Sequence, residues 1–253
     1  MIHEKNDRGE KVQTTVWEAP IAKIPVRATI TVPPLTAMGV DRSMIGRVHA
    51  PTVADAAVFL TAAACTTGTV VIRNWDTIAQ DPSAQVLREV LATMGAYVVR
   101  SAEGLTCTSR STSGHLTGIS IDLAGHPDLI APIFVLCSLA DDPSVIHGLA
   151  AHPEITRQVV ADMISVGADV LYDERTAVIT PRELHGGEWM GTGTASSSAL
   201  GAVLGLVVPD MRVFGIDLDS SEGRAFLAEW SDALAADEHI LPGATRGTVP
   251  YYT

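Results

Sequence analysis

The chain has 253 residues, of which 47% are hydrophobic and 18% charged, and its formal net charge is −12. These values are typical of an ordered globular chain, long enough for one large domain or two small ones. The acidic balance disfavours nucleic-acid binding, because a phosphate backbone needs Lys and Arg to replace its counterions. No apolar run is long enough to span a bilayer, so the sequence predicts no membrane-spanning helix.

The three cysteines, Cys65, Cys107 and Cys137, show neither a CxxC motif nor the spacing of a metal site. Cys65 and Cys137 fall inside apolar helical runs, which predicts buried free thiols and fits a reducing compartment. The charged start of the chain lacks the apolar segment of a signal peptide. We therefore expect a cytoplasmic protein that needs no metal and no cofactor.

The chain begins with a polar segment, residues 1–15, which is expected to be mobile. Residues 26–32 are rich in β-branched side chains and are predicted to form a strand that Pro33 and Pro34 end. A short connector then runs to residue 47, where a repeated pattern begins.

The first copy of the pattern predicts two helices, a strand and a hairpin. Residues 53–65 are Ala-rich and helical, and residues 69–73 form the strand that follows. Apolar residues at 86–94 have helical spacing and predict an amphipathic helix. The hairpin strands are predicted at residues 97–100 and 105–108.

The pattern occurs twice in full and begins a third time. Its first half recurs at residues 52–75, 128–149 and 196–216, and its second half at residues 84–109 and 156–181. A repeat of this length fixes the architecture, so it takes precedence over single motifs.

This alignment makes three strand valines equivalent, namely Val70, Val145 and Val213. Each unit then has the order β-α-β-α-β-β, and the third, which opens at Glu188, stops after its first strand. The helix at 196–205 contains no charged residue, and an all-round apolar helix is a buried one. The sequence therefore predicts an α/β domain with helices inside and sheets outside.

The opening strand reads VRATITVP, and the first repeat reads GRVHAPTVADAAVFLTAAACTTGTVVIRNW. Together with the MGA and VGA hairpin units, these segments resemble the 5-enolpyruvylshikimate-3-phosphate synthase family of the actinobacterial type, over residues 17–33 and 46–230. The resemblance implies one family lobe at residues 16–240, an inside-out α/β barrel of three pseudo-symmetric units, followed by a tail at 241–253. A last helix is expected at residues 222–235.

The family has two such lobes, with the active site in the cleft between them. After the opening strand it continues with a Gly-Ser-Lys-Ser loop and then builds its other lobe. Here Pro34 and the residues after it replace that loop, and the return lobe resumes at Gly46. The resemblance therefore implies that the connector at 33–47 stands in place of a whole lobe.

The family's reaction adds a hydroxyl to phosphoenolpyruvate and expels phosphate, so it needs Lys and Arg to hold anions. Its Lys-Glu-Ser/Thr-Asp-Arg motif falls near residues 153–157, where the Lys is absent and Glu154 and Arg157 remain. Its Asp-His-Arg motif falls at residues 194–196, where all three side chains are replaced. The comparison implies a dismantled phosphoenolpyruvate site.

Asp128 lies where the family keeps an acidic residue that acts in proton transfer. By its position before an apolar helix, it is either a helix N-cap or a catalytic or ligand-binding carboxylate. His126 and His152 each precede a Pro and an acid, in the sequences GHPD and AHPE. These triplets serve either acid–base catalysis or a recurring loop structure.

The remaining candidates lie at the starts of two helices. Glu154 is either a solvated cap residue or a base, and Arg157 is the candidate for pairing with an anion. Ser196, Ser197 and Ser198 either start a helix or bind an anion or a carbonyl oxygen at its N-terminus. We assign Asp128, His126 and Glu154 as catalytic candidates. The substrate-binding candidates are His152, Arg157, Ser196, Ser197 and Ser198.

Three functions follow in order of preference. The first is a specialised-metabolism enzyme that dehydrates, isomerises or cyclises a non-phosphorylated small molecule. The second is a non-catalytic binding or partner subunit, and the third is residual enolpyruvyl transfer. The face left by the missing lobe is expected to be apolar or neutral, which predicts a homodimer.

Overall fold

The structure is a computed structural model that describes residues 4–5, 11–12, 30–32, 45–66, 68–109, 115–215, 221, 224–225 and 228–229. Within the segment expected to be mobile, strands β1 (Glu4–Lys5) and β2 (Lys11–Val12) form a short antiparallel pair. The polar composition of that segment did not predict this pair. Most of the helix expected at 222–235, and the whole tail at 241–253, lie outside the described residues.

The first two units have the same order of elements. The first consists of β4 (Ile45–Val48), α1 (Val53–Cys65), β5 (Thr69–Ile72), α2 (Trp75–Ile78), α3 (Pro82–Thr93), β6 (Tyr97–Ser101) and β7 (Gly104–Thr108). The second consists of β8 (Ser120–Asp122), α4 (Pro127–Ser138), β9 (Ser144–His147), the 3-10 helix η1 (Leu149–Ala151), α5 (Pro153–Ser165), β10 (Asp169–Tyr172) and β11 (Ala177–Thr180). Their sheets are ordered β4-β5-β7-β6 and β8-β9-β11-β10, so the strands pair identically.

The third unit is completed by the start of the chain. It contains β12 (Glu188–Trp189), α6 (Ala195–Gly205) and β13 (Met211–Val213). The opening strand β3 (Ile30–Val32) pairs antiparallel with β13, the place that β7 and β11 hold in the other sheets. Residues distant in sequence therefore close the third sheet, in agreement with the pattern of one lobe.

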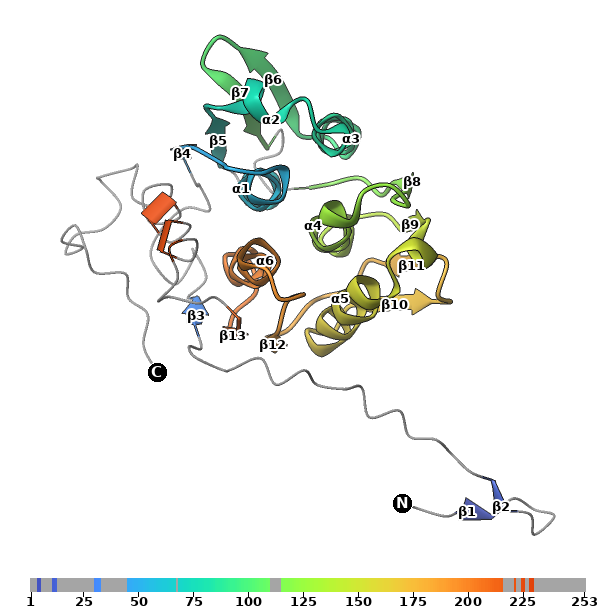
Figure 1. The fold of residues 1–253 in the computed structure, drawn as a ribbon. Helices are drawn as coiled ribbons and strands as arrows, with labels where there is room; N and C mark the ends of the chain where they lie inside the picture. Colours follow the sequence, from blue (N-terminus) through green and yellow to red (C-terminus); the bar gives the residue numbers. More distant parts are fainter. Residues whose placement is uncertain are drawn as a thin grey trace.

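The three inner helices α1, α4 and α6 form the centre of the lobe. They contact one another, and nearly all of their side chains are buried. Figure 1 shows them close together and nearly end-on, with the sheets arranged around them and α3 and α5 farther out. Small side chains, especially in α6, allow this close approach. The predicted mixed α/β arrangement, with helices inside, is confirmed.

The inner helices run in the same direction. The Ser196 hydroxyl of α6 donates to the Asp55 carboxylate of α1 at 2.6 Å, so these two helices begin at the same end. The C-terminal ends of α4 and α6 line one cavity, so α4 shares their direction. Parallel helices add their dipoles, and the N-terminal end therefore carries partial positive charge.

One predicted equivalence is wrong by a single residue. Val70 and Val213 are fully buried, whereas Val145 lies on the outer face of β9 and is only half-buried. Ser144 and Ile146 point inward instead. Because side chains alternate along a strand, a shift of one residue exchanges the two faces.

The cysteines are buried and free, as the sequence predicts. Burial raises the pKa of Cys107 to about 12 and that of Cys137 to about 11. These two thiols therefore stay protonated and unreactive at neutral pH. No helix in the described part of the chain is long and apolar enough to cross a membrane.

One close approach inside the core is testable at Gly201 of α6. A Cβ atom there would lie 2.6 Å from Cγ of Trp189, whose side chain is fully buried and has no room to move. We expect Gly201→Ala to lower the free energy of unfolding by about 1–3 kcal/mol through overpacking, as measured by urea denaturation.

Gly125→Ala is the matched control, because a Cβ atom there would meet nothing within 4 Å. It should change the free energy of unfolding by no more than about 0.5 kcal/mol. Equal effects of the two substitutions would contradict the tight contact between α6 and β12.

Candidate functional site

At the end of the lobe where the inner helices begin, the N-termini of two outer helices, α3 and α5, are joined to that of α4. The Ser83 hydroxyl of α3 lies 3.0 Å from Nδ1 of His126, which precedes α4. Nε2 of His152, which precedes α5, lies 2.8 Å from the carbonyl oxygen of Ala124 in the loop before α4. We call this end of the lobe, formed by the N-termini of α1, α3, α4, α5 and α6, the rim.

The two His-Pro-acid triplets have the same backbone structure. His126 has φ −135° and ψ 62°, and His152 has φ −136° and ψ 59°. Each is the N-cap residue of its helix, and neither side chain bonds its own helix. Each imidazole instead reaches a neighbouring segment, so the recurring loop structure also places two histidines at the rim.

Asp128 is not the N-cap of α4, because His126 holds that position. The cap alternative for Asp128 is therefore wrong. Its side chain lies in the first turn, is exposed, and makes no hydrogen bond or ion pair with any described residue. An unpartnered carboxylate thus projects from the start of a buried helix.

Glu154 and Arg157 form a surface pair at the start of α5. Their Oε1 and NH1 atoms lie 2.8 Å apart, and the two side chains are 87% and 50% exposed. An exposed pair of this kind contributes little to stability. Glu154 is not a cap either, since His152 is the N-cap residue. No hydrogen bond within the described residues joins this pair to Asp128.

The three serines at the start of α6 belong mainly to the fold. Ser196 bonds Asp55, as described above, and the Ser197 amide donates to the N-cap residue Thr194 at 3.2 Å. The Ser198 hydroxyl is buried and has no partner in the described structure. These contacts match the helix-start alternative, and ligand binding by the three serines stays a prediction.

Asp162 is a structurally important carboxylate that the sequence analysis missed. Its side chain is 2% exposed and accepts from the amides of Met190 at 3.1 Å and Gly191 at 2.9 Å. Gln158, one turn earlier on α5, donates to it at 2.9 Å. These bonds fix the loop that leads into α6. Burial nevertheless raises the pKa of Asp162 to about 6, although the donors favour the charged form.

A family model for EPSP synthase (3-phosphoshikimate 1-carboxyvinyltransferase) matches residues 22–219. The chain belongs to this family. A curated family member from Tropheryma whipplei, named 3-phosphoshikimate 1-carboxyvinyltransferase, is 28% identical over 188 residues. That match covers 72% of this chain and 41% of the relative.

Two solved structures of EPSP synthase from Acinetobacter baumannii have the same fold. Their TM-scores are 0.59 and 0.57, each at 19% identity, and each match covers 73% of this chain and 46% of the other. The chain therefore spans less than half the length of these relatives. The comparisons establish the family and the fold of the matched part of the chain.

Against this family, the supply of cations at the rim is small. The chain has no lysine after Lys23. Arg157 stands at the rim but pairs with Glu154. Other arginines are engaged in pairs on the strands or hairpins, namely Arg47 with Glu103, Arg100 with Asp76 and Arg212 with Glu188.

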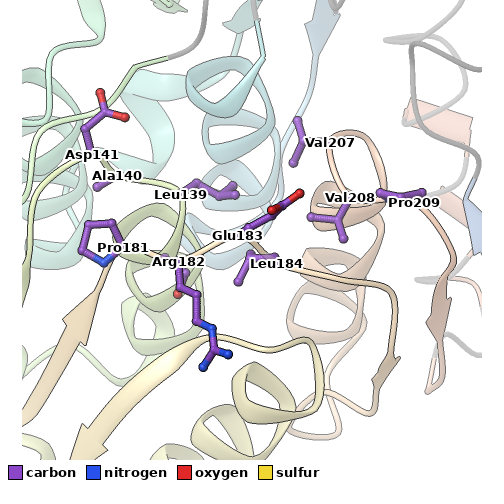
Figure 2. Close-up of a pocket in the computed structure, with 11 residues that line it drawn as sticks. Leu139, Ala140, Asp141, Pro181, Arg182, Glu183, Leu184, Val207, Val208 and Pro209 are labelled. Carbon is purple, nitrogen blue, oxygen red and sulfur yellow. The ribbon is translucent and has the colours of Figure 1, made fainter.

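The opposite end of the lobe holds a separate, open cavity of about 550 Å³ between the C-terminal ends of α4 and α6. Leu139, Leu184 and Val207 contribute apolar surface to it, and Figure 2 shows Arg182 pointing away from Glu183. None of the predicted site residues lines this cavity. Nowhere in the described ranges do three His, Cys, Asp or Glu side chains gather as metal ligands would.

The rim also bears on the predicted homodimer. The large exposed hydrophobic side chains of the described residues are Tyr97, Ile164 and Leu171. Tyr97 and Ile164 lie at the far ends of β6 and α5 from the rim, and Leu171 lies on the outer face of β10. The described rim is polar, so the apolar face behind the dimer prediction is not present there, and the dimer stays a prediction.

Asp162 gives a testable dependence of stability on pH. Its folded-state pKa of about 6 lies above the ordinary value of 3.8, so the folded state binds the proton more tightly. The resulting stabilisation is complete below about pH 4 and is lost as the pH rises through about 6. We expect the stability of the wild type relative to Asp162→Asn to fall by up to about 3 kcal/mol over that range.

Urea denaturation of both proteins between about pH 4 and about pH 7 measures this difference. The Asn side chain cannot titrate, so its lost hydrogen bond adds only a constant offset. A difference that does not vary with pH would contradict the buried, titrating carboxylate.

Proposed function

We propose that the rim binds a non-phosphorylated small molecule and performs acid–base chemistry on it, as a dehydration, isomerisation or cyclisation in specialised metabolism. The observation that carries the proposal is Asp128, an exposed carboxylate without a partner in the described structure, at the start of a buried helix. His126 and His152 belong to the same row of helix N-termini. Carboxylate and imidazole are the common proton carriers of enzymes.

The charges of the rim argue against phosphoenolpyruvate as the substrate. Losing one charged contact to a buried anion costs about 2–5 kcal/mol. Here the family's Lys and its Asp-His-Arg side chains are replaced, and Arg157 is already paired. The inner helices carry only Asp55 and Asp128 as charged residues, and both repel an anion. We therefore rank residual enolpyruvyl transfer to a shikimate-type substrate last.

A neutral or carboxylate-bearing ligand suits the rim better. Helix N-termini present unpaired amide groups and partial positive charge, which can hold one carboxylate or polarise a carbonyl without lysine. A phosphate with two negative charges needs more cationic groups than this. The ligand should therefore contain carbonyl or carboxyl oxygen and no phosphate.

The alternative function is a binding or partner subunit without catalysis. The observation in its favour is the span of the match, which covers less than half of the solved relatives. In such a subunit the rim would dock on another protein, and Asp128 would pair with a basic residue there. A homodimer is the version of this arrangement predicted from the sequence.

Phosphate release tests the reaction that we rank last. With phosphoenolpyruvate and shikimate 3-phosphate, we expect no release above background, because the groups that hold the two phosphates are absent. A two-lobed EPSP synthase in the same assay is the positive control. Turnover at a rate near that of the control would overturn the proposed loss of enolpyruvyl transfer.

Asp128→Asn tests the proposed chemistry. The side chain makes no bond with any described residue, so only its favourable interaction with the helix dipole is lost, and stability should change by less than about 1 kcal/mol. Turnover should be abolished, because the amide cannot carry the proton. The assay uses non-phosphorylated hydroxy carbonyl compounds selected by thermal-shift screening.

Asp142→Asn is the matched control for that substitution. Asp142 is exposed and unpartnered in the described structure, and it lies beyond the C-terminal end of α4. It should retain full turnover. Equal turnover of both variants would show that Asp128 takes no part in catalysis.

A further inference from the structure

The first sheet carries a groove of about 300 Å³ that is separate from the site residues of the rim. Arg47, Val71, Arg73 and Glu103 line this groove, so it contains two cations and one anion. Figure 1 shows the sheet on the side of α1 that faces away from α4 and α6. In a chain with a net charge of −12, the groove is therefore a place of local positive charge.

The register of two parallel strands places both arginines on the outer face of this sheet. Arg47 of β4 lies opposite Val71 of β5, and Val48 lies opposite Ile72. Val48 and Ile72 are fully buried, so they face the core. Side chains alternate along a strand, so Arg47, Val71 and Arg73 point outward. The amide of Arg73 also donates to the Val48 carbonyl at 3.0 Å, which extends the pairing to this residue.

A glycine brings the hairpin turn between β6 and β7 against the end of β5. Gly104 begins β7 with φ +127°, and a Cβ atom there would overlap the carbonyl oxygen of Ile72. Glycine alone permits such an approach in this conformation. The turn thereby holds Glu103 beside Arg47, with 3.5 Å between the Oε2 and NH2 atoms.

Both guanidinium groups are available to a ligand. The side chains of Arg47 and Glu103 are 62% and 68% exposed, and an exposed pair of this kind is weak. The side chain of Arg73 is exposed and makes no hydrogen bond or ion pair in the described structure. A bound anion would therefore compete only with Glu103 for these two cations.

The second sheet shows that the shared fold does not require the two arginines. The buried residue of its second strand, Ile146, is followed by His147 in the place of Arg73. Ser120 of β8 holds the place of Arg47. The strands of the two sheets nevertheless pair in the same order. The arginine pair therefore adds charge to the first sheet without being needed to build it.

We propose that this groove binds a phosphate group, free or as a small phosphomonoester, between the guanidinium groups of Arg47 and Arg73. A guanidinium group binds carboxylate or phosphate oxygens in a bidentate manner. A carboxylate has two oxygens and one charge, which a single arginine can match. A phosphomonoester has three terminal oxygens and about two negative charges at neutral pH, which suits two arginines.

The volume of the groove restricts the ligand to a small one, because about 300 Å³ is at the lower end of small-molecule sites. Val71 supplies a half-buried apolar floor between the two cations. The proposal is independent of the function proposed for the rim, since none of the rim candidates lines the groove.

Calorimetric titration of the intact protein with inorganic phosphate at low ionic strength tests the site. The wild type should bind a single phosphate saturably. Arg47→Gln and Arg73→Gln should each weaken binding by about tenfold or more, because each removes a charge-assisted contact. Glu103→Gln removes the competing carboxylate and should strengthen binding by about two- to fivefold.

Arg175→Gln is the matched control, because Arg175 is exposed and lies in the corresponding hairpin turn of the second sheet. It should bind phosphate as the wild type does. Absence of saturable binding, or an unchanged affinity of Arg73→Gln, would overturn the proposal. Circular dichroism of each variant should match the wild type, because the exchanged side chains are exposed.

Modification of arginine by phenylglyoxal locates the site in the wild type, without any variant. Phosphate should slow the modification of Arg47 and Arg73 and leave that of Arg175 unchanged, as followed by peptide mass spectrometry. Sodium chloride at the same ionic strength is the control for screening. Equal protection of all three arginines, or equal protection by chloride, would show general screening and contradict a site.

Phenyl phosphate and benzoate distinguish the possible ligands. Phenyl phosphate should bind at least about tenfold more tightly than benzoate, because a carboxylate engages only one of the two arginines. Equal binding of the two compounds would overturn the assignment to phosphate. Tighter binding of phenyl phosphate than of inorganic phosphate would support a phosphomonoester as the ligand, and the reverse order would support the free ion.

Discussion

The parallel packing of three uncharged helix bodies is the constraint on which the rest of the lobe depends. Beyond their first turns, α1, α4 and α6 carry no charged side chain, and they contact one another in the centre. Such helices are stable only when they are buried on all sides. The sheets must therefore surround them, and their only charged residues, Asp55 and Asp128, must lie at their N-terminal ends. The chemistry of the rim follows from how the core packs.

The same geometry explains how a site can persist with few basic residues. Helix N-termini leave amide groups without partners and carry partial positive charge. In this chain, carboxylate side chains already lie at part of that positive end. Asp55 accepts from its own cap residue Thr52 and from Ser196 of the next helix. Asp162 likewise holds the two amides that lead into α6. Internal carboxylates thus take positions where a ligand anion would otherwise be favoured, which leaves Asp128 facing solvent.

Local sequence signals predicted the elements well, and long-range contacts set the limit. The helix at Val53–Cys65 was predicted with its observed ends, because an Ala-rich run follows a capping residue. Val145 was placed on the wrong face because Ile146 beside it is equally apolar. Asp128 was weighed as a cap because Asp is a common one, yet His126 takes that place. One signal could have identified Asp162, because it is a carboxylate on the buried face of α5. Its partners could not be predicted, since they lie 28 and 29 residues away in the sequence.

The pairing of β3 with β13 closes the third sheet with residues from near the start of the chain. The strand pairings of the three sheets and the contacts among the inner helices are all made between described residues of this chain. The rim carries an exposed carboxylate and two half-exposed imidazoles, and no large exposed apolar side chain among the described residues lies on it. An interface that replaced the second lobe would have to desolvate these groups, and a buried carboxylate without a partner is costly. The polar rim therefore favours a small ligand or a basic partner over an apolar contact between two copies.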